Sequence, residues 1–336
     1  MPENNVLQYK STYPTAHQID DVRLRSFNND ADFDLIASII QRSLRADRIL
    51  RLPTRESIAH GYSSLRNFNP QRDVMLAVQN DKPIGFVRLN WNLDSQGCIR
   101  LKHQSYTLPR LRQTGVSEQL LAYAETRLKP LAHNCKQDGM AYLSSDAYES
   151  EVEKWGLLER AGYHIETTYH DMICDLHQIY PVQIGQKELH VRPAGEEDQA
   201  LIWKLICDHE ADMNHWESGD YAIRRQNPLH QPALWKVLLH GEDVVGCALS
   251  HINHQENRTL GRRWAYIDRL IIKPEWRTTD TTHMLMLHTL KELKSSGIRH
   301  AICRVERDDP VCGRRCLKEL GFHTLKRFSA YRKNLN

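Results

Sequence analysis

The sequence predicts an α+β protein built from two copies of one unit, each a mixed and mostly antiparallel sheet flanked by helices. Three blocks of sequence occur twice, in the same order and at nearly constant spacing. The openings of the two halves agree as well, and a segment with little periodicity lies between them. Matched blocks in a fixed order favour duplication of a unit of roughly 150 residues, a common size for a domain.

Each half opens with a predicted strand, an acidic turn and an amphipathic helix, in DVRLRSFNNDADFDLIASIIQRSL and again in LHVRPAGEEDQALIWKLICDHE. Between the halves, Pro181 and Gly185 stand in a segment that lacks periodicity, which is typical of a linker. The expected organisation is an N-terminal tail at residues 1–18, a first domain at 19–176, a linker at 177–188 and a second domain at 189–336.

A strand hairpin is the first repeated block. Residues 73–91 read as an apolar strand, a polar turn and a second strand, and residues 233–252 repeat the pattern. Gly85 and Gly246 stand at matching places near the start of the second strand, 161 positions apart. The agreement supports duplication.

Two further blocks place helices in each copy. Residues 108–128 match residues 273–293, with Arg112 opposite Arg277, and apolar residues recur at helical spacing just after the turn in both. Later, Gly162 and Gly321 occupy matching positions, 159 apart, where each is predicted to stop a helix before a last strand. The sequence thus predicts the same order of elements twice.

This order of a hairpin, a strand ending at proline, an arginine-containing turn into a helix, and a late GY or GF resembles the GNAT acetyltransferase superfamily. The layout over residues 20–336 is similar to tandem acetyltransferases related to mycothiol synthase. PALWKVLLHGEDVVG, LKELGF and the HW pair at His215 and Trp216 stand where that group's second domain would place similar stretches.

The resemblance implies an N-acyltransferase that uses acetyl-CoA or another acyl-CoA and a small-molecule amine. The family's loop pattern, Arg/Gln-x-x-Gly-x-Gly/Ala, is nearly matched by RQTGVS in the first unit. Backbone N–H groups at a helix N-terminus can hold a pyrophosphate, and glycine permits close approach and a positive φ. The predicted cofactor-binding residues are Arg110, Arg112, Gly115, Val116 and Ser117.

The matching loop of the second unit, RTTDTT, keeps only the arginine and carries Asp280 where alignment on that arginine puts Gly115. A carboxylate about 5 Å from a phosphate charge costs about 3 kcal/mol at an effective dielectric constant of about 20. Losing glycine at a left-handed position would add about 1 kcal/mol. We therefore expect the cofactor in the first unit, while Asp280 acts as an ordinary helix N-cap or marks a closed phosphate site.

The general base is predicted on the strand before each loop, where the resembling family often uses a carboxylate. Counting six residues back from the proline gives Asp268 in the second copy and His103 in the first. Strand alternation puts Asp268 on the face of Leu270 and Ile272, where a lone carboxylate is costly unless it is partnered or functional. Pairing with a nearby arginine would give Asp268 a structural role instead.

A tyrosine serves as general acid in many members of the family, four residues before the late glycine. Both copies have leucine there, Leu158 and Leu317. The thiolate of coenzyme A can leave without a proton donor, so this departure weakens the enzyme hypothesis without excluding it. Tyrosines that could approach from elsewhere are Tyr106, Tyr163, Tyr169 and Tyr331.

The stretch CDHEADMNHWE gathers histidines and carboxylates, but along one helix they would point in several directions, so we expect no metal site. The resemblance implies instead that this helix faces the substrate, which makes His215 and Trp216 the predicted substrate-binding residues. The scattered cysteines also lack zinc-site spacing and fit a reducing compartment.

Composition narrows the class of partner. The net charge is only +3, so no general attraction to nucleic acid is expected, although the C-terminal stretch is locally basic. The N-terminus is polar, and no run approaches the roughly 20 apolar residues of a membrane span. We expect a cytoplasmic protein that binds neither membrane nor nucleic acid.

Two other functions remain open on the sequence. The protein could be a pseudo-acetyltransferase that has lost cofactor binding in its second domain and serves as a ligand-binding or interaction module. It could also transfer an aminoacyl group from charged tRNA, in which case RNA binding would depend steeply on salt.

Overall fold

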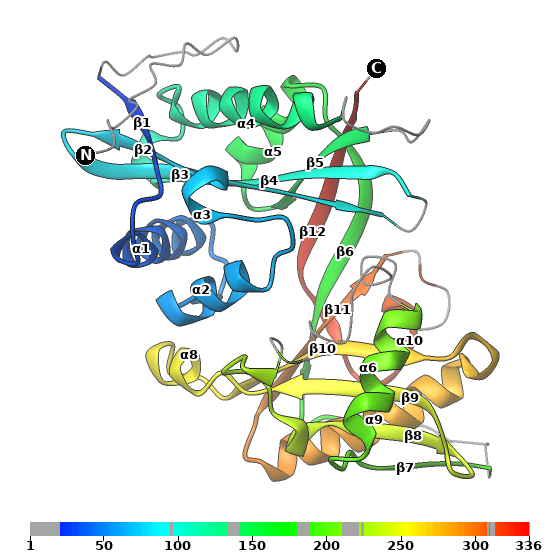
Figure 1. Ribbon diagram of the computed structural model, residues 1–336. Coiled ribbons are helices and arrows are strands. Elements are labelled where there is room, and N and C mark those ends of the chain that lie inside the picture. The colour runs from blue at the N-terminus through cyan, green and yellow to red at the C-terminus, as the bar shows by residue number, and fades with distance from the viewer. Residues whose placement is uncertain are drawn as a thin grey trace. The chain divides into compact units, whose positions relative to one another are not determined.

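The computed structural model describes residues 21–94, 97–132, 141–179, 188–209, 222, 225–307, 309 and 313–335. The chain forms two compact units. Unit 1 comprises Met1–Glu166 together with Ser329–Asn336, and unit 2 comprises Thr167–Phe328. Each is a mixed sheet with helices on its faces, as predicted (Figure 1).

Unit 1 is built on a sheet with strand order β1-β2-β3-β4-β5, antiparallel except for the parallel pair β4 and β5. Helices α4 and α5 pack on one face and α1 on the other (Figure 1). Its elements are β1 (Arg23–Ser26), α1 (Ala31–Ala46), α2 (Arg55–Ser63), α3 (Pro70–Asp73), β2 (Val74–Gln79), β3 (Lys82–Leu93), β4 (Ile99–Thr107), the 3-10 turn η1 (Pro109–Leu111), α4 (Val116–Ala132), β5 (Ala141–Tyr148) and α5 (Val152–Arg160).

Unit 2 repeats this arrangement with β7-β8-β9-β10-β11, in which only β10 and β11 run parallel. Helix α9 packs on one face and α6 on the other. Its elements are β7 (Leu189–Pro193), α6 (Asp198–His209), η3 (Pro232–Leu234), β8 (Lys236–His240), β9 (Asp243–His251), α8 (His254–Thr259), β10 (Trp264–Ile272), η4 (Pro274–Trp276), α9 (Thr279–Ser295), β11 (His300–Glu306) and α10 (Arg314–Glu319).

Two long strands, β6 (His164–Asp175) and β12 (His323–Asn334), each contribute to both units. From Thr167 onward β6 belongs to unit 2, where Ala301 of β11 pairs with Cys174. From Ser329 onward β12 belongs to unit 1, beside β5 in the strand order. The units therefore differ from consecutive domains at 19–176 and 189–336. Residues 180–187 of the expected linker lie outside the described residues.

The paired glycines of the hairpins have the same structural role. Gly85 of β3 lies opposite Thr107, and Gly246 of β9 lies opposite Ile272. A Cβ atom at Gly85 would lie 3.0 Å from the Tyr106 carbonyl oxygen, and one at Gly246 would lie 2.9 Å from the Ile271 carbonyl oxygen. Both strands thus need glycine because a neighbouring backbone approaches closely. This confirms the predicted match.

Replacing Gly85 with alanine should lower the free energy of unfolding by about 1–3 kcal/mol, because the added methyl group meets backbone that cannot move freely. The matched control is Gly61→Ala in α2, where nothing lies within 4 Å of the added atom. There alanine should stabilise by about 0.5–1 kcal/mol through its higher helix propensity. Urea unfolding measures both changes, and a neutral Gly85→Ala would contradict the packing argument.

The late glycines end helices in both units, as predicted. Gly162 has φ +85° and Gly321 has φ +94°. The next residue in each copy returns a backbone hydrogen bond to the last helical turn, from Tyr163 to Leu158 at 3.0 Å and from Phe322 to Leu317 at 3.1 Å. This geometry needs a left-handed residue after the helix, which explains glycine at both sites.

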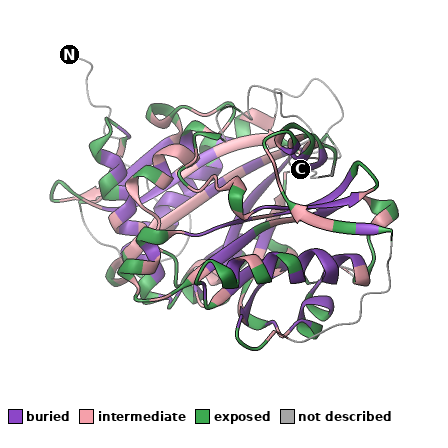
Figure 2. Cartoon of the chain, turned by 90° about the horizontal axis from the view of Figure 1, so that it is seen from below, coloured by how far each residue is buried: buried purple, intermediate pink, exposed green. Residues whose placement is uncertain are grey.

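Buried residues follow the strands and the sheet-facing sides of the helices (Figure 2). Helices α4 and α9 each bury the apolar stripe that the sequence predicted, which comprises Leu120, Leu121, Ala124 and Leu128 in α4 and Met286, Leu287, Leu290 and Leu293 in α9. Among the described helices, none is both long and apolar enough to cross a membrane.

Candidate functional site

The site in unit 1 begins where two parallel strands part. The ladder between β4 and β5 joins Ile99–Lys102 to residues 141–144, although β4 continues to Thr107 and β5 to Tyr148. Beyond Lys102 the ladder between these two strands stops, and the Ser145 hydroxyl of β5 donates to the His103 carbonyl oxygen of β4 at 3.1 Å.

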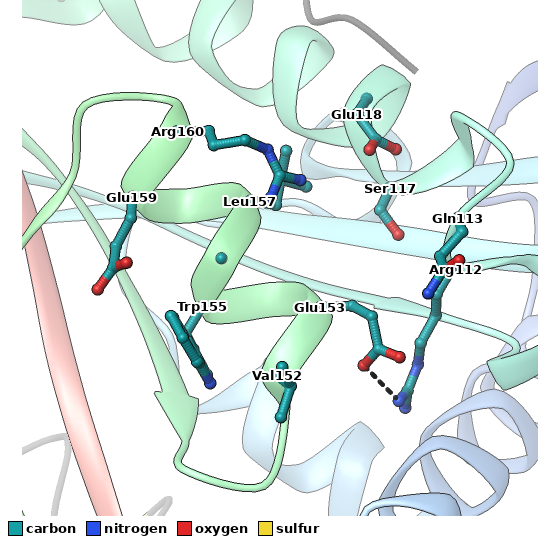
Figure 3. Close-up of a pocket in the computed structure, with 11 residues that line it drawn as sticks. Arg112, Gln113, Ser117, Glu118, Val152, Glu153, Trp155, Leu157, Glu159 and Arg160 are labelled. Atoms are coloured by element: carbon teal, nitrogen blue, oxygen red, sulfur yellow. Dashed lines mark ion pairs between the residues drawn. The ribbon is translucent and has the colours of Figure 1, made fainter. Parts of the chain in front are cut away.

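A cavity of about 640 Å³ lies beside this opening. The loop before α4 contributes Arg112 and Gln113, the first turn of α4 contributes Ser117 and Glu118, and α5 contributes the opposite wall (Figure 3). A smaller cavity of about 40 Å³ shares Arg112 and Ser117 with it and reaches Tyr106 on β4. The pocket thus leads from the start of α4 toward the diverging strands.

The turn before α4 has the conformation that the glycine predicted. Gly115 has φ +88°, and α4 begins at the next residue, Val116. The first N–H groups of a helix have no partner within it and point out of its N-terminus, where they can bind an anion. The Ser117 hydroxyl donates to the Thr107 hydroxyl at 3.0 Å. The Val116 side chain is buried in the core, so only its backbone N–H could contact a ligand.

Arg112 lines both cavities but is already held by α1. Its guanidinium donates to both carboxylate oxygens of Asp47, each at 2.6 Å, and to the Ser43 hydroxyl at 2.7 Å. Its distance to Glu153 is 3.6 Å, drawn as a dashed line in Figure 3. The sequence predicted that the positive charge of Arg112 binds the cofactor, but Asp47 already largely balances that charge. Arg110 is exposed and lines neither cavity.

Glu118 is a pocket residue that the sequence analysis missed. It stands in the first turn of α4, is only 7% exposed, and has one carboxylate oxygen, Oε2, without a hydrogen-bond partner among the described residues. Burial raises the pKa of its carboxyl, while the backbone N–H of Glu118 and the charge of Arg160 act against this. Glutamate is common in a first helical turn, so sequence alone gave no reason to single it out.

Charged groups are buried at the diverging strands. Asp146 of β5 pairs with Lys102 at 2.9 Å and lies 4.0 Å from Lys154. Burial opposes its ionisation, but the two ammonium groups hold the pKa of Asp146 well below its usual range. Glu151 accepts a hydrogen bond from the Tyr148 N–H at 2.8 Å, and burial raises its pKa. The opening thus holds one firmly ionised carboxylate and one that can take up a proton.

Residues 201–322 match the sequence profile of the acetyltransferase (GNAT) family. A GCN5-related N-acetyltransferase from Sphaerobacter thermophilus resembles the chain with a TM-score of 0.71 at 17% identity, covering 94% of this chain and 96% of that chain. A tandem GNAT protein from the clavulanic acid biosynthesis pathway has a TM-score of 0.64 at 13% identity, covering 94% and 98%. The fold is a tandem of two GNAT-like units.

No curated protein sequence matches the tandem GNAT-like chain. The profile match lies wholly within the second GNAT-like unit, whereas the glycine turn and the cavity described above belong to the first. The resemblance to mycothiol synthase relatives stays a prediction.

His103 lies just beyond Lys102, the last residue of β4 that pairs with β5, as a base at the opening would, but it lines neither cavity. It is 1% exposed, and its Nε2 lies 2.9 Å from the Tyr163 hydroxyl. Burial lowers the pKa of His103 to about 4, so the imidazole is neutral at pH 7. The structure thus pairs the buried His103 imidazole with the Tyr163 hydroxyl. The role of His103 as a base stays a prediction.

Asp268 occupies the equivalent place in the second GNAT-like unit, since the parallel ladder of β10 and β11 ends at Ile267. The register of β10 shifts between Ile267 and Arg269, so Asp268 is a bulged residue. The expectation that alternation buries it beside Leu270 was wrong, because the bulge interrupts the alternation and leaves its side chain 54% exposed. Its carboxylate contacts His251 Nδ1 at 2.5 Å.

The loop of the second unit also differs from the sequence alignment. Two residues, Arg277 and Thr278, separate η4 from α9, whereas four residues separate η1 from α4. The N-cap of α9 is Thr278, whose side chain accepts from the Thr281 N–H at 3.2 Å, so the expectation that Asp280 caps the helix was wrong. Asp280 instead lies in the first turn.

A shorter loop explains why no glycine is needed there. Thr278 has φ −122°, an ordinary extended conformation, so the second loop lacks the left-handed turn formed by Gly115. The Arg277 side chain pairs with Asp309 at 2.5 Å. Aligning the arginines therefore placed Asp280 opposite Gly115 although the two helices begin at different distances from their arginines.

The predicted substrate-binding pair, His215 and Trp216, lies outside the described residues, as does most of the CDHEADMNHWE stretch. Leu158 and Leu317, which replace the expected tyrosine acid, are buried. Of the alternative tyrosines, Tyr106 lines the smaller cavity. Burial raises its pKa well above the usual value, with Glu151 and Asp146 adding to the effect, so its phenol stays protonated at neutral pH.

Proposed function

We propose that the protein is an acyl-CoA-dependent N-acyltransferase that holds its cofactor in unit 1 and acylates a small-molecule amine. One observation carries the proposal: the left-handed turn at Gly115 starts a helix whose first turn lines a cavity of about 640 Å³. That size suits a small ligand or a part of one, and the smaller cavity beside it reaches the diverging strands.

The residues of this pocket fit the diphosphate of coenzyme A, with one exception. The turn at Gly115, the first-turn N–H groups and the cation of Arg160 all favour an anion. Glu118 opposes it, because an ionised carboxylate in the same helical turn would repel phosphate. An acyl-CoA bound there would supply a thioester as acyl donor.

Glu151 and Tyr106 are the proton-transfer groups of this proposal. Both line the smaller cavity. A carboxylate with a raised pKa is a stronger base than an ordinary one, so Glu151 suits acceptance of a proton from an amine. Tyr106, whose phenol stays protonated, suits donation to a leaving thiolate. His103 stays an alternative base in unit 1, and Asp268 stays the candidate base of unit 2.

Calorimetric titration of the full chain with coenzyme A and with acetyl-CoA tests the proposal. We expect one cofactor per chain and, with a panel of small amines, release of free thiol from acetyl-CoA. Absence of binding by either compound at millimolar concentration would refute it.

The alternative function, a pseudo-acetyltransferase with no cofactor site in its second domain, is favoured by the shortened loop before α9 and by the pairing of Arg277 with Asp309. The same titration separates the two proposals. Cofactor binding without thiol release over a broad panel of amines supports a binding module, whereas thiol release that depends on the amine supports the enzyme.

A further inference from the structure

We propose that Glu118 couples cofactor binding to proton uptake, so that unit 1 takes up a proton at this carboxyl when the diphosphate of coenzyme A enters the pocket. The inference rests on the proposed function and goes beyond it, because it concerns the state in which the pocket accepts its ligand. It assigns Glu118 as a residue that sets the affinity.

The geometry compensates the Glu118 carboxylate only in part, through its own backbone N–H and the charge of Arg160. It lies in the first turn of α4 and lines the cavity, yet only 7% of it is exposed. Its Oε2 has no hydrogen-bond partner among the described residues. Arg160 extends from α5 toward the start of α4 but forms no ion pair with Glu118 among the residues drawn in Figure 3.

The other charged residues around the pocket leave the Glu118 carboxylate only partly compensated. Arg112, on the loop, is held by Asp47, and Glu153 of α5 lies 3.6 Å from it. Glu159 of α5 adds another carboxylate to the lining. With Arg112 held by Asp47, Arg160 is the remaining cation of the lining. Glu153 and Glu159 are exposed, so water and salt screen them. Glu118 is buried, and its charge acts on an incoming phosphate with little screening.

The sign of the coupling follows from this arrangement. Burial already raises the pKa of Glu118, and an anion bound nearby raises it further. The protonated carboxyl carries no charge and can donate to a phosphate oxygen. Binding is therefore strongest when Glu118 is protonated. Affinity should fall by up to about tenfold per pH unit between the pKa of the free protein and that of the complex.

The test is calorimetric titration with coenzyme A in buffers of different ionisation enthalpy, from about pH 6 to 9, which gives both the affinity and the number of protons taken up. The wild-type chain is compared with Glu118→Gln and with Glu159→Gln, a control that removes an exposed carboxylate from the same pocket. Phosphate groups of the ligand titrate with a pKa of about 6, but their contribution is common to all three proteins.

We expect the wild type and Glu159→Gln to take up protons when coenzyme A binds, with affinity falling as pH rises. Glu118→Gln should take up fewer protons, show a flatter profile, and bind at least about tenfold more tightly than wild type at the alkaline end. Equal proton uptake by wild type and Glu118→Gln would overturn the coupling, and so would weaker binding by Glu118→Gln. If none of the three proteins binds coenzyme A at any pH, the proposed function falls together with the coupling. Proton uptake by the wild type alone is a readout that does not depend on any variant folding.

Discussion

Replacing Gly115 with aspartate is expected to weaken coenzyme A binding to unit 1 by about a thousandfold. The new carboxylate would stand at the entrance to the first turn of α4, where at about 5 Å from a phosphate charge it costs about 3 kcal/mol. A non-glycine residue at φ +88° adds about 1 kcal/mol, because the turn that presents the N–H groups becomes strained. Titration with coenzyme A measures the loss.

Gly97→Asp is the matched control for this variant. Gly97 has φ +78°, belongs to unit 1 and has nothing within 4 Å of an added Cβ, so the control introduces the same charge and a similar backbone strain away from the pocket. We expect its affinity for coenzyme A to remain within about twofold of wild type. Equal affinities of the two variants would show that the turn at Gly115 does not hold the cofactor.

Replacing Arg112 with methionine is expected to lower the free energy of unfolding of unit 1 by about 3–5 kcal/mol. The side chains of Arg112 and Asp47 are only 13% and 5% exposed, so the substitution leaves a buried carboxylate without its cation. The matched control is Arg72→Ala, which breaks the pair with Asp73 where the arginine side chain is 55% exposed. It should cost less than about 1 kcal/mol in urea unfolding.

The double variant Arg112→Met with Asp47→Leu separates the structural role of Arg112 from its predicted cofactor role. Removing both charges should restore most of the lost stability, because no uncompensated charge stays buried. Coenzyme A affinity in the double variant then reports on loss of the arginine from a chain that has no buried unpaired carboxylate at position 47. Affinity close to that of wild type would assign Arg112 to holding the loop on α1, whereas a tenfold loss would support the predicted contact with the cofactor.

Local constraints were predictable from the sequence by itself. Periodicity gave the order of helices and strands in both copies, because the apolar face of each element repeats along the chain. Glycine marked two kinds of position correctly, the left-handed turn at Gly115 and the helix stops at Gly162 and Gly321. It also matched Gly85 with Gly246, although only the structure showed the close backbone contact at both. At each of these the backbone itself excludes a side chain, so the residue type reveals the geometry.

Features that depend on distant partners were not predictable. The bulge at Asp268 is a property of the pairing between two strands, and it turned an expected core position into an exposed one. The engagement of Arg112 requires Asp47, which lies 65 residues away. Glu118 could be recognised as a pocket residue only once α5 had covered the first turn of α4.

The sequence alone therefore determined that one α+β unit occurs twice and that the first copy keeps a glycine turn before its helix, because these follow from periodicity and backbone freedom along a short stretch of chain. The tertiary structure decided that β6 and β12 each serve both units, that the second loop is two residues shorter, and that a buried carboxylate faces the first pocket. Burial and pairing depend on segments that meet only after folding, so no local pattern specifies them.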